Sequence, residues 1–70
     1  LDARGLLCPL PVLKARKRLQ AVAVGETLTM VADDPVAVID VPHFCMEAGH
    51  ELVSSEAYGN DQTYVIRKSS

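Results

Sequence analysis

The spacing of apolar and polar positions predicts an alternation of helices and strands along the chain. From Pro9 to about Gln20, apolar residues recur every three to four positions, as on one face of a helix. That face carries Val12, Ala15 and Leu19, with Lys14, Lys17 and Arg18 opposite. Thr27 to Ala32 instead alternates between apolar and polar residues, which predicts a half-buried strand.

A second helix is expected from Val36 to about Ala48. Asp33 or Asp34 would cap it, with Pro35 at the first helical position and Gly49 as the C-terminal stop. Pro42 lies inside this segment and is expected to kink the helix or split it. Its expected core face holds Val38, Val41, Pro42 and Cys45, with Phe44 at the edge of the core.

Short strands are expected at both ends of the chain. Leu1 to Arg4, closed by Gly5, is expected to be the end of a first strand. Glu51 to Tyr58 and Thr63 to Lys68 would form a closing hairpin. The order β-α-β-α-β-β predicts one α/β (α+β) two-layer sandwich over residues 1–70, with a four-stranded mixed sheet and both helices on one face.

Composition narrows the class of protein further. The 70 residues are 49% hydrophobic and 23% charged, which is typical of a small globular domain. No apolar run is long enough for a membrane span and no signal-peptide pattern opens the chain. Two cysteines and two histidines show no paired metal-ligand spacing, so we expect no metal or cofactor and a cytoplasmic location. Leu1 is not an initiator methionine, and we expect residues to precede it.

Positive charge is concentrated near the start of the chain. Five of the seven lysine and arginine residues lie in the first 20 positions, where Asp2 is the one acidic residue, although the net charge is −2. Such a basic region can steer an acidic partner. The low pI and the lack of interleaved aromatic residues argue against direct nucleic-acid binding.

The stretch Cys8-Pro9-Leu10-Pro11 holds the candidate reactive group. A residue before proline avoids the α region, so Cys8 is expected just outside the helix, with Pro9 and Pro11 in its first turn. We expect the thiol to lie near the positive end of the helix dipole and close to Arg4. Both would lower its pKa and favour the nucleophilic thiolate.

Absences limit what this thiol could do. A dithiol oxidoreductase needs a resolving cysteine, usually two residues along, where this chain has Leu10-Pro11. A cysteine hydrolase needs a positioned histidine base, and the spacing of His43 and His50 nominates neither. A thiol that relays a group between proteins by exchange remains. Cys45 is interpreted as a core residue.

Several segments resemble the TusA/SirA-like sulfur carrier proteins. The resemblance rests on "LDARGLLCPLPVLKARKRL" with its Cys-Pro-x-Pro motif, and on "GETLTMVADDP", "DVPHFC", "GHELV" and "YVIRK". It implies a βαβαββ sandwich similar to the C-terminal domain of bacterial translation initiation factor three.

The resemblance also implies a function. Cys8 would carry sulfane sulfur as a persulfide, taken from a cysteine desulfurase or rhodanese-like donor. It would pass the sulfur to an acceptor such as a DsrE-like sulfurtransferase, serving tRNA thiolation, molybdenum cofactor assembly or sulfur oxidation. Pro9 and Pro11 would present the thiol. Arg4, Lys14, Lys17 and Arg18 are the candidate docking residues.

Two other functions fit the sequence. One is a regulatory or interaction module that performs no sulfur transfer. The other is a redox-sensing thiol that is oxidised to a sulfenate or a mixed disulfide at Cys8.

Overall fold

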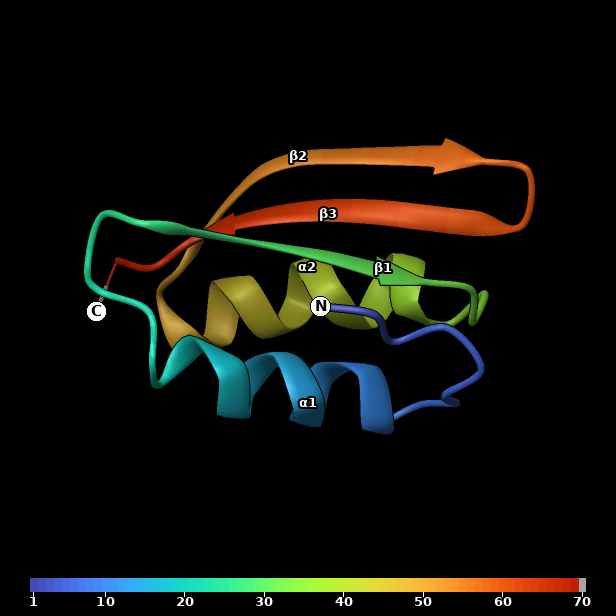
Figure 1. The fold of residues 1–70 in the computed structure, drawn as a ribbon, viewed down its shortest axis with the longest axis horizontal. Coiled ribbons are helices and arrows are strands. Elements are labelled where there is room, and N and C mark those ends of the chain that lie inside the picture. The colour runs from blue at the N-terminus through green and yellow to red at the C-terminus, as the bar shows by residue number, and fades with distance from the viewer. Residues whose placement is uncertain (70) are drawn as a thin grey trace.

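The computed structural model describes residues 1–69, which fold into two layers (Figure 1). One layer is a β-sheet and the other is a pair of helices that cover the same face of the sheet. The elements in chain order are α1 (Leu10–Leu19), β1 (Thr27–Ala32), α2 (Ala37–Ala48), β2 (Glu51–Tyr58) and β3 (Asp61–Arg67). The expected α+β class with both helices on one face is confirmed.

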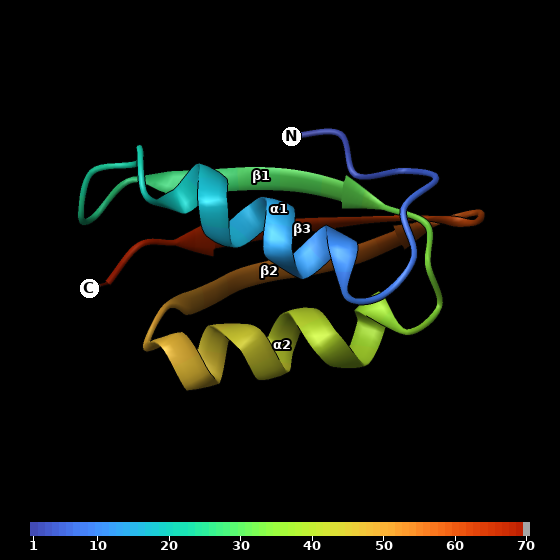
Figure 2. The ribbon, with the colours of Figure 1, turned by 90° about the horizontal axis from the view of Figure 1, so that it is seen from below.

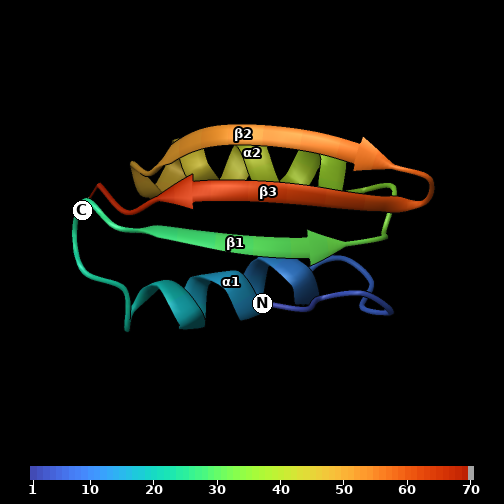
Figure 3. The same cartoon turned by 45° about the horizontal axis from the view of Figure 1, so that its top comes forward.

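The sheet has three strands in the order β1-β3-β2, and every pairing is antiparallel (Figure 3). In the register of the central strand, Tyr64 lies between Met30 of β1 and Ser55 of β2. The pairing of β2 with β3 shifts between Leu52 and Ser54, a β-bulge that leaves Val53 unpaired.

The expected fourth strand does not form, and the expectation of a mixed sheet was therefore wrong. Residues 1–3 make one isolated parallel bridge beside β1, between Asp2 and Val31. The Ala3 N–H donates to the Val31 carbonyl at 2.7 Å, and the Val31 N–H donates to the Leu1 carbonyl at 2.9 Å. The chain then turns away, because the Asp2 carboxylate accepts the Arg4 N–H and Gly5 follows with a φ of 80°.

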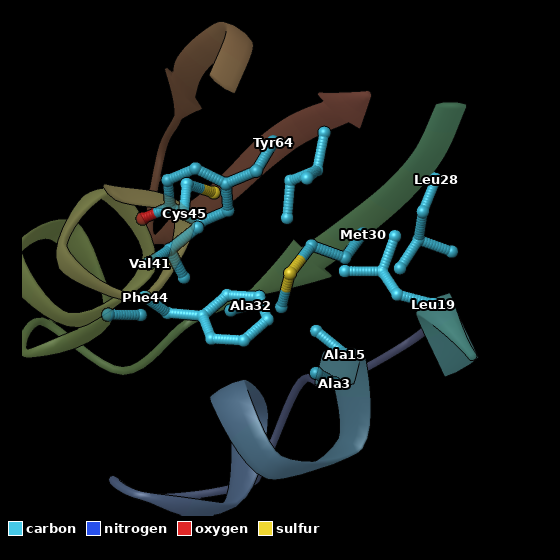
Figure 4. Close-up of a cluster of buried hydrophobic side chains, with 12 residues drawn as sticks. Ala3, Ala15, Leu19, Leu28, Met30, Ala32, Val41, Phe44, Cys45 and Tyr64 are labelled. Atoms are coloured by element: carbon cyan, nitrogen blue, oxygen red, sulfur yellow. The ribbon is translucent and has the colours of Figure 1, made fainter. Parts of the chain in front are cut away.

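The hydrophobic core lies between the sheet and the helices (Figure 4). Strand β1 begins and ends where its alternation predicts, and Leu28, Met30 and Ala32 are all buried. Strand β3 contributes Tyr64 and Ile66 to the core, and α1 contributes Ala15 and Leu19.

The core face of α2 contains Val41 and Cys45, as expected, but differs from the expected face in its other members. Its buried residues are Ala37, Val41, Phe44 and Cys45, at the helical spacing i, i+4, i+7 and i+8. Val38 is more than half exposed, so its assignment to the core was wrong, and Phe44 is a full core member.

Pro42 does not split α2, which continues from Ala37 to Ala48. The helix also begins later than expected, so Pro35 precedes it and is not its first residue. Gly49 ends it in the left-handed conformation with a φ of 77°, as the sequence predicts.

Candidate functional site

Both helices begin at the same end of the sheet, and Cys8 lies in the loop that enters α1 there (Figure 2). Two consecutive aspartates between β1 and α2 hold this loop. The Gly5 N–H donates to Asp33 Oδ1 at 2.9 Å, and the Cys8 N–H donates to Asp34 Oδ2 at 2.6 Å. The backbone of Cys8 is therefore fixed against the segment that leads into the other helix.

Asp34 connects Cys8 to the interior of the molecule. Its side chain is nearly buried, and its second oxygen, Oδ1, accepts the Val36 N–H at 3.1 Å. Its main-chain carbonyl accepts Gln62 Nε2 at 3.2 Å, and Gln62 Oε1 accepts the buried Tyr64 hydroxyl at 2.9 Å. A chain of buried hydrogen bonds thus joins the central strand β3 to the backbone of Cys8.

The Cys8 thiol faces Asp40, one turn into α2. Its Sγ–H donates a hydrogen bond to Asp40 Oδ2, and the side chain is exposed to solvent. This bond and the negative charges of Asp40 and Asp34 raise the pKa of Cys8 above its ordinary value. The expected lowering of this pKa was wrong, because the thiol donates to Asp40, is partly desolvated and lies near two negative charges.

Arg4 does not contribute the positive charge expected beside the thiol. Its guanidinium forms salt bridges with Asp2 at 3.0 Å and with Asp61 at 3.7 Å. The hydrogen bonds that Arg4 donates to Asp2 lower the pKa of the Asp2 carboxyl group to about 2. Arg4 therefore stabilises the N-terminal segment, and the charged group in contact with the sulfur is Asp40.

The two prolines of the motif lie on opposite sides of the helix surface. Pro9 is the N-cap of α1 and is exposed, whereas Pro11 is buried in the first turn. The Cys8–Pro9 peptide bond is cis. The free donors nearby stay within the backbone, since the Leu10 N–H bonds the Leu7 carbonyl and the Leu13 N–H bonds the Pro9 carbonyl. Neither of these donors is directed at the sulfur.

The sulfur opens onto a shallow groove of about 390 Å³ between α1 and α2. Its apolar part is formed by Pro9, Val12 and Phe44, and its polar part by Asp40, His43 and Glu47. His43 Nε2 lies 3.4 Å from Glu47 Oε1, one turn along the same exposed side of α2. The groove therefore presents a thiol, an apolar floor and two carboxylates to any partner that docks there.

A family model for "Sulfurtransferase TusA" matches residues 1–68, almost the whole chain. The chain belongs to the TusA family. The fold is similar to a crystal structure of a SirA-like protein from Desulfitobacterium hafniense, with a TM-score of 0.83. The two sequences are 21% identical, and the match covers 100% of this chain and 96% of that one. At the level of the family, the chain is a sulfurtransferase of the TusA type.

Three of the basic residues of this TusA-family chain lie apart from the groove. Lys14, Lys17 and Arg18 line a separate hollow on the outer surface of α1. Lys14 Nζ lies 3.4 Å from the carbonyl oxygen of Asp2. Arg16, Lys17 and Arg18 occupy the last turn of α1, where positive charge also stabilises the negative end of the helix dipole.

Cys45 is a free thiol in the core, and burial raises its pKa. Among residues 1–69, no cluster of three or more histidine, cysteine, aspartate or glutamate side chains could hold a metal ion. Over the same residues, no helix has the length and apolar character needed to cross a bilayer.

The sequence interpretation missed Asp40 and gave Asp34 too small a part. Asp33 or Asp34 was predicted to cap α2, but its N-cap is Val36 with no side-chain cap hydrogen bond, and Asp34 instead accepts the N–H groups of Cys8 and Val36. Asp40 is 32 positions from Cys8 and opens the segment "DVPHFC", to which the sequence interpretation assigned no role in the site. The predicted topology held a usable signal. Helix α1 follows the N-terminal segment and α2 follows β1, and these two segments were predicted to run parallel to each other. Both helices must then start at the same end of the sheet, which brings their first turns together.

Proposed function

We propose that Cys8 is the sulfur-carrying residue of this TusA-family protein and holds sulfane sulfur as a persulfide. The observation that carries the proposal is an exposed, free thiol in the Cys-Pro-x-Pro motif that opens directly onto a groove between the helices. A partner can place its own sulfur against Cys8 without entering the protein.

In the proposed cycle, the Cys8 thiolate attacks the outer sulfur of a donor persulfide. A new S–S bond forms at Cys8, the donor's S–S bond breaks, and the donor leaves as a thiolate. An acceptor thiolate then attacks the outer sulfur on Cys8 and releases the Cys8 thiolate. Each step is an exchange at sulfur with no net oxidation, and the proton lost from each attacking thiol passes to solvent.

A cysteine desulfurase or a rhodanese-like protein supplies such a donor persulfide, and an acceptor thiol protein such as a DsrE-like sulfurtransferase receives the sulfur. We assign Pro9 and Pro11 the role of presenting the thiol. In this proposal Arg4, Lys14, Lys17 and Arg18 are docking contacts that lie outside the groove. Delivery to tRNA thiolation, molybdenum cofactor assembly or sulfur oxidation follows from the acceptor.

The raised pKa of Cys8 favours this proposal over a redox-sensing thiol. Sensor cysteines react with peroxide as thiolates, and they depend on a lowered pKa. The neighbouring carboxylates raise the pKa of Cys8 instead. A carrier meets its substrate only in a complex, where the partner can supply the charges that favour the thiolate.

The test is the intact mass of the protein after incubation with a cysteine desulfurase and L-cysteine. We expect wild type to gain the mass of a sulfur atom, which a reducing thiol should remove again. Cys8→Ser should gain no mass. Cys45→Ala is the matched control and should load as wild type does. If Cys8→Ser takes up as much sulfur as wild type, Cys8 is not the carrier residue. Partner binding without any loading of wild type would indicate the regulatory module.

A further inference from the structure

The Cys8 thiol donates its hydrogen bond to a carboxylate that has no cationic partner of its own. Within residues 1–69, Asp40 takes part in none of the four salt bridges. Its side-chain contact is the Cys8 thiol, and its side chain is only half-buried. One Asp40 oxygen thus faces the reactive sulfur while the carboxylate also borders the open groove.

The other charged groups around the sulfur do not balance Asp40. From the segment before α2, Asp34 adds a second negative charge. From α2, His43 is paired with Glu47 one turn along the same helix. From α1 and its N-cap, Val12 and Pro9 supply an uncharged groove wall, and Arg16 lines a neighbouring hollow with Phe44 and Glu47. Arg4, which precedes α1, pairs with Asp2, and Lys14 of α1 lies 3.4 Å from the Asp2 carbonyl oxygen. The charges that act on the Cys8 thiol are therefore those of Asp40 and Asp34, and both are negative.

We propose that Asp40 is a gate on Cys8, which keeps the unoccupied carrier as a protonated thiol until a partner brings a cationic side chain to the groove. An arginine or lysine beside the partner's own transferable sulfur would pair with Asp40. Pairing withdraws the carboxylate from the thiol, so that the thiol proton passes to solvent and the thiolate forms where the partner sulfur waits. Asp40 acts through Cys8 and is a positioning residue.

The gate gives the groove a specificity that its shape alone does not. A partner with an acidic or neutral transfer site would meet an unreactive thiol, and small oxidants in solution would meet the same thiol. A partner with a cationic transfer site would bind Asp40 and, by doing so, convert the Cys8 thiol into the thiolate that attacks the partner's sulfur. This inference rests on the proposed transfer role of Cys8 for its biological meaning, but its chemistry can be measured without any sulfur donor.

The first experiment follows the rate of Cys8 alkylation by iodoacetamide as a function of pH, in a Cys45→Ala background so that Cys8 is the sole thiol. Asp40→Asn removes the charge and should move the profile to lower pH. If the pKa of Cys8 falls by about one, the thiolate fraction near pH 7 rises about tenfold, while its intrinsic nucleophilicity falls about threefold. We therefore expect alkylation of Asp40→Asn to be about threefold faster than in the parent.

Two matched variants separate the gate from general charge or structural effects. Glu47→Gln removes one negative charge from the same helix and the same groove without contacting the sulfur, and it should leave the profile nearly unchanged. Asp40→Glu keeps the charge and should keep alkylation slow. The proposal would be overturned if the pH profile of alkylation for Asp40→Asn coincided with that of the parent. It would also be overturned if that profile shifted only as much as the profile of Glu47→Gln.

The second experiment tests the response to cations in the Cys45→Ala parent itself, which needs no folded variant at Asp40. Two methanethiosulfonate reagents of similar size are compared, one bearing a trimethylammonium group and one a sulfonate. We expect the cationic reagent to react faster, with a preference that shrinks as salt is added. Equal rates for the two reagents would contradict the gate. Failure of persulfide loading by a desulfurase would refute the carrier function alone.

Discussion

Asp34 holds the backbone of Cys8 in place, although it performs no chemistry. Its two oxygens each accept one main-chain N–H, from Cys8 and from Val36, and the side chain is 5% exposed. Both oxygens must therefore be acceptors. An amide cannot meet that demand, because one of its two ends can only donate.

Asp34→Asn should consequently lower the free energy of unfolding by about 1–3 kcal/mol, since a buried N–H is left facing another donor. Urea denaturation followed by circular dichroism measures the change. Asp33→Asn is the matched control, because Asp33 accepts only the Gly5 N–H through Oδ1, which an asparagine retains. Equal losses in the two variants would show that the buried pair of acceptors at Asp34 has no special importance.

At the scale of residues, the sequence predicts the thiol but not its surroundings. Cys8 stands out because its prolines are adjacent in the chain, and local pattern is sufficient to find them. Its electrostatic environment depends on Asp40, which is brought near by the packing of α1 beside α2. The pKa direction inferred from the helix dipole was wrong for that reason. A contact 32 positions away outweighs a dipole whose donors bond elsewhere.

At the scale of elements, what could be predicted depends on where each segment finds its partners. Strand β1 alternates strictly because one side faces the core, so its bounds follow from the sequence alone. The segment from Leu1 to Arg4 has the same local character, but its extent depends on how far it stays beside Val31. The core face of α2 was misplaced because Val38 and Phe44 are both apolar, and only the sheet beneath selects between them.

The hairpin between β2 and β3 offers a test of an element by its turn. Tyr58 pairs with Asp61, so two residues, Gly59 and Asn60, form the turn, and Gly59 has a φ of 61°. An added Cβ would meet no atom within 4 Å, so any cost of substitution is conformational. Gly59→Ala should lose about 1–2 kcal/mol of stability in thermal or urea unfolding.

Gly59→Asn provides the comparison for that loss. Asparagine tolerates the left-handed region better than alanine and should restore part of the stability. If alanine and asparagine are equally destabilising, the loss comes from something other than the backbone conformation of the turn.

At the scale of the whole molecule, charge is divided between the two helices. The outer surface of α1 is basic, with Lys14, Lys17 and Arg18 together, whereas α2 presents Asp40 and Glu47 at the groove. A partner that fits both would carry an acidic area for α1 and a cation for Asp40. Such opposed patches fix the orientation of an encounter more strongly than they increase affinity.

Neutralising the basic side should therefore slow sulfur loading from a donor protein. We expect Lys17→Gln/Arg18→Gln to reduce the initial loading rate about three- to tenfold at low ionic strength, with little difference at high salt. The matched control is Arg67→Gln/Lys68→Gln, which removes the same charge at the far end of β3. A reduction of equal size in the control would indicate net charge and not a docking surface.

Asp40 would also affect the stability of a persulfide on Cys8. In the unloaded protein, the Cys8 thiol donates a favourable hydrogen bond to Asp40. Once Cys8 holds a persulfide, Sγ has lost that hydrogen and an anionic outer sulfur stands near a carboxylate of the same sign, an unfavourable pairing. In the proposed carrier role, the empty state of Cys8 would thus be favoured over the persulfide state. The protein would then pass sulfur on readily and store it poorly.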